Sequence, residues 1–157
     1  MTQDIDKQTV RNWIDDDLVQ RIEDVTDGDE AYNYLVQVSG MNFHIGRVRG
    51  TGPISVASTI EFDPETVALL MEREEKRRDL LTRFERVLTI APGWYTFLDG
   101  AGNPGCNFTE MRSIRLEYRI YPDGASQHAL MNGLIDMANA LVFLRDVMTS
   151  LAEAADE

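Results

Sequence analysis

The sequence predicts an α+β fold with a single, mostly antiparallel five-stranded sheet and helices in the order α-β-β-β-α-β-β-α. Three observations support this class. Apolar and polar residues alternate over 32–38 and 114–120, which is typical of strands with one solvated face. Apolar residues recur every three or four positions from 126 to 151, which indicates a long helix. The strands form two groups without the strand-helix-strand rhythm of a parallel sheet.

The N-terminal half begins with residues 1–8, which we expect to be frayed. A helix should follow, with one apolar side, and end near Asp27-Gly28; that side consists of Val10, Trp13, Ile14, Leu18, Ile22 and Val25. A hairpin is predicted from 32–38 and 41–45, joined by Ser39-Gly40. The alternation shifts by one residue at Gly46, which predicts a bulge before the third strand, 54–62.

The middle of the chain opens with Asp63-Pro64-Glu65, a strong helix start with aspartate as N-cap and proline at the first position. All eight residues of 72–79 are charged, and favourable pairs four residues apart, such as Glu74 with Arg78, predict one continuous helix through them. We place the end of its apolar face at Leu81, Phe84 and Leu88. A fourth strand over 94–98 and a long loop over 99–107 should follow.

The last third combines the fifth strand with a turn at Tyr121-Pro122-Asp123-Gly124 and a helix capped by Ser126. The core stripe of this helix is predicted to be Leu130, Leu134, Met137, Leu141, Leu144, Met148 and Leu151. A second apolar row and one aromatic residue leave more than half of the circumference apolar; they are Met131, Ile135, Ala138, Val142 and Phe143. We predict that these five residues form an interaction surface for another helix or another subunit. The alternative is that the N-terminal helix covers the row and Phe143 is a scattered surface aromatic.

Composition restricts the partners. The chain has 157 residues, which fits one domain over 1–157. Its net charge of −12 argues against nucleic acid or an anionic membrane as partner. The only lysines are Lys7 and Lys76, and this acidic, lysine-poor balance resembles proteins of halophilic archaea. No long apolar run or signal pattern is evident, so we expect a cytoplasmic protein.

Three segments carry a resemblance to a known family. They are the helix start Asp63-Pro64-Glu65, the turn Ile120-Tyr121-Pro122-Asp123-Gly124 and the Asn139-Ala140 step of the final helix. Together with the order of elements, they resemble a family of small archaeal proteins of unknown function with a type III secretion chaperone-like fold, over most of 9–151. The resemblance implies a homodimer-prone scaffold that holds extended or partly folded protein segments. It supplies no catalytic residues.

Several motifs have the residue types of a chemical site but lack its context. Residues 100–105 match G-x-G-x-x-G, yet a proline lies inside and no βαβ unit surrounds them, so a hairpin loop is predicted. Cys106 would need His44 or His128 beside it to act as a nucleophile. The spacing of Asp24, Asp27, Asp29 and Glu30 fits no calcium loop. We therefore predict no catalytic, cofactor-binding or metal-binding residues.

These observations predict a non-catalytic protein-interaction or chaperone-like binding scaffold that forms a homodimer and has a further protein partner. The alternative is a small-molecule sensor with a pocket between the sheet and the C-terminal helix, near Tyr32, Tyr34 and Trp94. An enzyme is disfavoured because no recognisable set of titratable residues is present.

Overall fold

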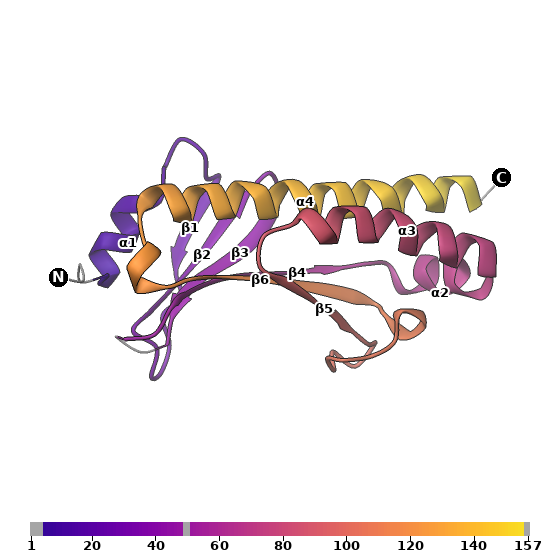
Figure 1. Cartoon of the computed structure of the whole chain (residues 1–157), viewed down its shortest axis with the longest axis horizontal. Helices are drawn as coiled ribbons and strands as arrows, with labels where there is room; N and C mark the ends of the chain where they lie inside the picture. The colour runs from indigo at the N-terminus through magenta and orange to yellow at the C-terminus, as the bar shows by residue number, and fades with distance from the viewer. Residues whose placement is uncertain (1–4, 49–50, 156–157) are drawn as a thin grey trace. The chain divides into compact units, whose positions relative to one another are not determined.

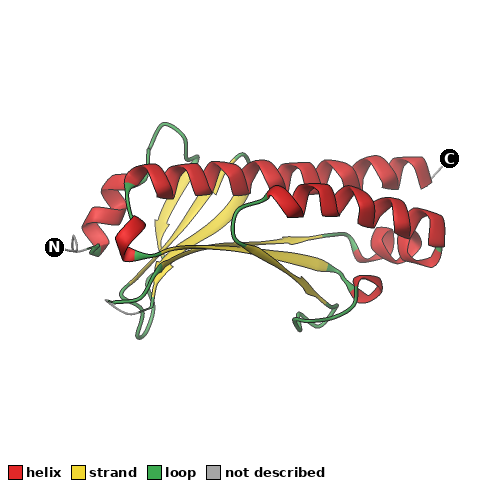
Figure 2. Cartoon of the chain, in the orientation of Figure 1, coloured by secondary structure: helices red, strands yellow, loops and turns green. Residues whose placement is uncertain are grey.

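The computed structural model describes residues 5–48 and 51–155 (Figure 1). Figure 2 shows its helices and strands, which follow one another along the chain in groups: one helix, four strands, two helices, two strands and a final helix. The helices are α1 (Lys7–Trp13), α2 (Pro64–Glu72), α3 (Glu74–Ile90) and α4 (Gln127–Ala155), with short 3-10 turns η1 (Phe108–Glu110) and η2 (Pro122–Gly124). The strands are β1 (Arg21–Asp24), β2 (Tyr32–Val38), β3 (Met41–Arg47), β4 (Ile54–Glu61), β5 (Trp94–Leu98) and β6 (Ser113–Ile120). None of these helices is long and apolar enough to span a membrane.

The strands form one antiparallel sheet in the order β1-β2-β3-β4-β6-β5. The α+β class is therefore confirmed, while the strand count is six instead of five. The extra strand is β1, which lies where we expected the second half of a helix. Its Ile22 pairs with Val36 of β2. The helix ends at Trp13 because aspartates follow, and Asp15 accepts hydrogen bonds from the backbone of Asp17 and Leu18 in a turn that competes with helix.

The β2–β3 hairpin is confirmed, but the predicted bulge at Gly46 is wrong. Asn33 pairs with Gly46 and Tyr32 with Arg47, so the register continues without an extra residue. Glycine at position 46 is instead explained by a close backbone neighbour. A Cβ at this position would lie 3.3 Å from the carbonyl oxygen of Tyr32, tighter than most side chains tolerate.

The chain divides into two compact units, Met1–Ser58 with Glu117–Ala138 (unit 1) and Thr59–Leu116 with Asn139–Glu157 (unit 2). β4, β6 and α4 each contribute to both units, and the single domain stays a prediction. In unit 1, α4 packs closely on β6, because a Cβ on Gly133 would lie 2.5 Å from the ring of Tyr118. Of the residues expected to be frayed, 1–4 lie outside the described range, whereas Ile5 is buried and α1 begins at Lys7 after the N-cap Asp6.

In unit 2, the predicted continuous helix is wrong, because Arg73 adopts an extended conformation between α2 and α3. Leu70 of α2 and Leu80 of α3, on either side of the break, are both fully buried. Burying a leucine side chain contributes roughly 1.5–3 kcal/mol, more than the roughly 0.2–0.5 kcal/mol of an exposed ion pair, so the charged pairs of 72–79 are too weak to fix the course of the backbone. The start at Asp63 and Pro64 is confirmed.

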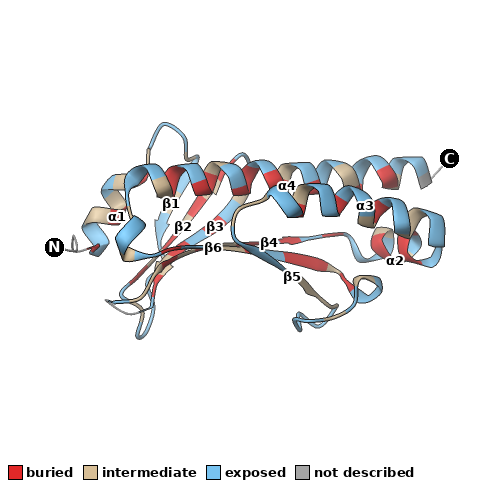
Figure 3. Ribbon diagram, viewed as in Figure 1, coloured by how far each residue is buried: buried red, intermediate tan, exposed pale blue. Residues whose placement is uncertain are grey.

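The final helix follows its sequence pattern closely. The backbone amide of Ala129 donates to the Ser126 hydroxyl at 3.0 Å, which confirms the N-cap. All seven residues of the predicted core stripe are buried. Buried and exposed positions alternate along α4, as Figure 3 shows.

Candidate functional site

The predicted interaction surface on α4 is only partly accessible. Met131 and Ala138 in unit 1 are buried, and Ile135 is half-buried. In unit 2, Val142 is half-buried, whereas Phe143 is 61% exposed. Of the five residues, Phe143 therefore presents the largest accessible apolar side chain.

A second apolar surface in unit 2 was not expected from the sequence. Ile90, the last residue of α3, is 84% exposed, and Trp94 and Tyr95 at the start of β5 are each 42% exposed. We call these three residues the 90–95 surface. Ala91-Pro92-Gly93 joins the helix to the strand, with Gly93 at φ +75°. A four-residue step spans at most about 14 Å, which limits the separation of Ile90 and Trp94, and as successive strand residues Trp94 and Tyr95 point to opposite faces of β5.

Strand β5 lies at the end of the described sheet, and part of its outer edge is covered by the chain itself. The Leu98 carbonyl accepts from Arg112, on the side of β6. Successive residues of a strand direct their backbone groups to opposite edges. On the outer edge, the Phe97 carbonyl accepts from Gly105 at 3.2 Å, and the Asp99 amide donates to Asn103 at 3.0 Å. The 103–105 segment thus covers the end of β5 and leaves 94–96 outside its reach.

This covering segment belongs to the G-x-G-x-x-G match, and the predicted hairpin loop is confirmed. Leu98 pairs with Pro104 in an antiparallel bridge, and Gly102 and Gly105 both have φ of +82°. The carboxylate of Asp99 accepts from the amides of Ala101 and Asn103, and hydrogen bonding to the Asn103 amide is the main cause of the lowered pKa of Asp99. These bonds shape the loop around its own aspartate.

The titratable candidates are engaged in ordinary local contacts. Burial raises the pKa of the Cys106 thiol, which is opposite to what an activated nucleophile requires. His44 contacts the Asn33 side chain at 3.2 Å, and His128 contacts that of Asn132. Asp24 binds Lys7 and Thr26. The described residues contain no group of three or more histidine, cysteine or acidic side chains arranged to hold a metal ion.

Tyr32 and Tyr34, which we expected beside a ligand pocket, are buried against the N-terminal segment. Their hydroxyls donate to the carbonyl oxygens of Ile5 and Lys7, each at 3.4 Å. Burial raises the pKa of Tyr32 to about 12. The guanidinium of buried Arg47 donates to the same Ile5 oxygen at 3.0 Å. These tyrosines therefore anchor the chain's own backbone.

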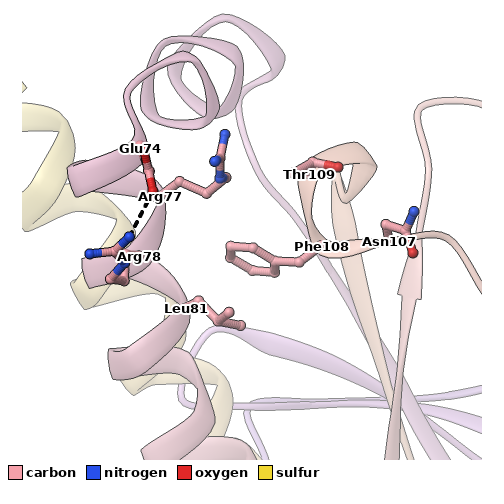
Figure 4. A pocket seen from close by; sticks show the side chains of 7 residues that line it. All are labelled: Glu74, Arg77, Arg78, Leu81, Asn107, Phe108 and Thr109. Atoms are coloured by element: carbon pink, nitrogen blue, oxygen red, sulfur yellow. Dashed lines mark hydrogen bonds and ion pairs between the residues drawn. The ribbon is translucent and has the colours of Figure 1, made fainter.

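A pocket does occur in unit 2, between α3 and the 107–109 turn, with a volume of about 270 Å³ (Figure 4). We call it the α3–η1 pocket. Its lining residues are Glu74, Arg77, Arg78, Leu81, Asn107, Phe108 and Thr109. The sequence contains no local signal for this pocket, because the charged run 72–79 predicts a continuous helix and 99–107 a loop. The charge pattern also gives no signal for the break at Arg73 that precedes this part of α3.

Comparisons with known proteins place the chain at the level of family and fold. The sequence model of the family described as "Uncharacterized conserved protein (DUF2299)" matches residues 6–148. The crystal structure of an uncharacterized protein from Methanothermobacter thermautotrophicus has a TM-score of 0.70 and 17% identity, covering 94% of this chain and 97% of its own. No curated protein matches. The likeness shows a shared fold, and nothing in these matches bears on the type III secretion chaperone-like assignment.

Proposed function

The chain belongs to the DUF2299 family of uncharacterized conserved proteins, and we propose that this member is a non-catalytic protein-interaction scaffold that forms a homodimer. The observation that carries the proposal is the 90–95 surface, three large apolar side chains exposed within six residues. Large exposed apolar side chains close together in the chain are common at protein–protein contacts, and tryptophan and tyrosine contribute strongly to such contacts.

The absence of charged residues makes this surface compatible with a second copy of the chain as its occupant. Two molecules of net charge −12 repel each other, so a contact between them requires uncharged surface. None of the five residues of β5 is charged, and Ile90-Ala91-Pro92-Gly93 before it is also uncharged. Phe143, in the same unit, supplies a further apolar group for the contact. A dimer of standard size would bury about 800 Å² on each subunit.

The mass in solution tests this proposal. Light scattering at micromolar concentration is expected to give twice the chain mass, and the dimer should strengthen at high salt, which screens repulsion and favours apolar burial. Ile90→Lys and Phe143→Asp should each shift the mass toward the monomer without unfolding the chain. Leu69→Lys is the matched control, since Leu69 is 55% exposed on α2 of the same unit. A monomeric wild type, or variants that dimerise like the control, would contradict the proposal.

The chaperone-like form of the proposal is that the same surface holds an extended or partly folded protein segment. Its support is the family resemblance of the sequence and the aromatic character of the 90–95 surface. The wild type should slow the aggregation of a chemically denatured client protein, as followed by turbidity. Ile90→Lys should lose this effect and Leu69→Lys should retain it. Equal protection by both variants would exclude this surface as the client site.

A further inference from the structure

We propose that the α3–η1 pocket binds a small ligand in which one carboxylate is joined to an apolar group. None of its lining residues belongs to the 90–95 surface, so the inference does not depend on self-association.

Hydrogen-bond donors dominate the polar lining. Arg77 and Arg78 carry guanidinium groups, and Asn107 and Thr109 add an amide and a hydroxyl. The one carboxylate in the lining, that of Glu74, already accepts from Arg78 at 2.7 Å. Acceptor oxygens of a ligand complement the two guanidinium groups, and the Asn107 amide and the Thr109 hydroxyl can donate to them as well.

The structure holds Arg77 in place before any ligand arrives. Its Nη1 atom donates to the carbonyl oxygen of Met71 at 3.0 Å, across the break between α2 and α3. This bond takes one of the five N–H donors of the guanidinium. Figure 4 shows the side chain extending from α3 toward the 107–109 turn. A preoriented guanidinium loses less conformational entropy on binding a planar carboxylate than a free one.

The apolar wall is formed by Phe108 and Leu81, with the Phe108 ring directed toward α3 in Figure 4. Two neighbouring rings fix its position. Phe84 lies 6.4 Å and Phe97 5.5 Å from it between ring centroids, both in edge-on arrangements. An apolar group attached to the carboxylate would pack against this wall.

Charge and size set the class of ligand. Two arginines and one glutamate give the lining a formal charge of +1, which one carboxylate neutralises. A phosphate dianion would leave an uncompensated negative charge in a chain that already carries −12. The volume of about 270 Å³ lies just below the range of about 300–1,000 Å³ that holds drug-sized ligands, so the ligand is small.

Titration with 3-phenylpropionate, followed by amide NMR, tests the proposal. Chemical shifts should change in 74–81 and 107–109, with a dissociation constant in the millimolar range expected for about ten non-hydrogen atoms. The neutral 3-phenylpropanamide, which has the same shape, should bind at least tenfold more weakly. Equal binding of acid and amide, or shifts confined to other residues, would overturn the proposal.

Two matched arginine variants locate the site. Arg78 and Arg83 each form an exposed ion pair with an acidic residue four positions earlier on α3, and only Arg78 lines the pocket. Arg78→Gln should weaken 3-phenylpropionate about fivefold or more, whereas Arg83→Gln should leave its affinity unchanged. Leu81→Glu adds a negative charge to the wall and should abolish binding while the remaining amide spectrum is preserved. Equal effects of the two arginine variants would contradict the site.

The same titration distinguishes two sources of the carboxylate. N-acetyl-alanyl-phenylalanine offers it as a peptide C-terminus, and its amidated form is the control. Tighter binding of the free-acid peptide than of 3-phenylpropionate supports a chain terminus as the ligand. Weaker binding supports a free small acid. If neither acid binds, the proposal fails, and the light-scattering result for the dimer remains a separate test.

Discussion

The two outer strands of the sheet, β1 and β5, differ in how they meet solvent. Three of the four residues of β1 are charged: Arg21 pairs with Glu23 at 2.9 Å, and Asp24 pairs with Lys7. β5 has no charged residue and exposes Trp94 and Tyr95. Proteins commonly protect edge strands with charged side chains or with covering segments. β1 is protected by charged side chains along its length, whereas β5 is protected by a covering segment only at its C-terminal end.

The two edges are stabilised by different kinds of contact. On the β1 side, the N-terminal segment is bound by the unit itself: Ile5 by Tyr32 and Arg47, and Lys7 by Tyr34 and Asp24. On the β5 side, aromatic rings run from buried Phe84 through Phe108 and Phe97 to exposed Tyr95. The apolar edge at β5 is thus supported by rings packed within its own unit, and this is the edge at which we propose the dimer contact.

The largest effect is expected where the N-terminal segment is anchored. Arg47→Met removes the guanidinium that donates to the carbonyl oxygens of Ile5 and Gly52. Each hydrogen bond to a charged group contributes roughly 1.5–3 kcal/mol, and removing the buried charge also removes its desolvation cost. The free energy of unfolding should therefore fall by about 3 kcal/mol. Urea denaturation measures it. The control Arg21→Met, on exposed β1, should change stability by less than about 0.5 kcal/mol. Similar losses of stability in Arg47→Met and Arg21→Met would contradict a special contribution of the buried guanidinium of Arg47.

A smaller effect is expected from the aromatic support of β5. Phe97→Ala removes ring contacts at 5.4 Å with Tyr95 and 5.5 Å with Phe108, and each such pair contributes about 0.5–1.5 kcal/mol beyond area burial. We expect a loss of about 2 kcal/mol, together with a weaker dimer. Tyr95→Ala, which removes one pair only, should lose about half as much in the same urea experiment. A dimer of unchanged stability in Phe97→Ala would contradict the idea that the inner aromatic rings support the dimer contact at β5.

The smallest effect concerns pH on the β1 side. Hydrogen bonds from Lys7 and then Thr26 lower the pKa of Asp24 to about 2 from an ordinary value of 3.8. The carboxylate of Asp24 binds a proton less readily in the folded chain than in the unfolded chain. Its contribution to the free energy of unfolding is therefore present above about pH 4 and is lost as pH falls toward 2. Asp24→Asn should flatten the decline of stability over this range. NMR titration of Lys7→Met should show the pKa of Asp24 moving back up; an unchanged value would contradict the pairing.

Periodicity predicted well those elements whose pattern and burial agree. The α4 stripe and strands β2, β4 and β6 follow from alternation or helical spacing, and Asp63 and Ser126 cap the helices as expected. The failures have a common physical origin. Ile22 fits a helix face and a strand equally well, and its pairing with Val36 decides the outcome. Arg73 lies in a run of charges that favours helix locally, yet its backbone is extended between two helices that both bury leucines.

The candidate sites were harder to predict because they depend on exposure and on distant segments. Phe143 was identified from its odd position on the helix, and it is exposed. Trp94 was assigned to a pocket, although it lies on an exposed edge. Arg77 and Phe108 lie 31 residues apart, and no local pattern connects them. Only the fold brings them to one pocket.

The contact between Gly133 and Tyr118 constrains attempts to engineer this protein. Glycine inside a helix costs about 1 kcal/mol relative to alanine, so a design procedure that scores helix propensity alone would replace it. A Cβ there would lie 2.5 Å from the tyrosine ring, so either the ring of Tyr118 or the helix above it would have to shift. A thermostabilised version of this chain must therefore keep Gly133, or exchange Tyr118 for a smaller residue in the same step.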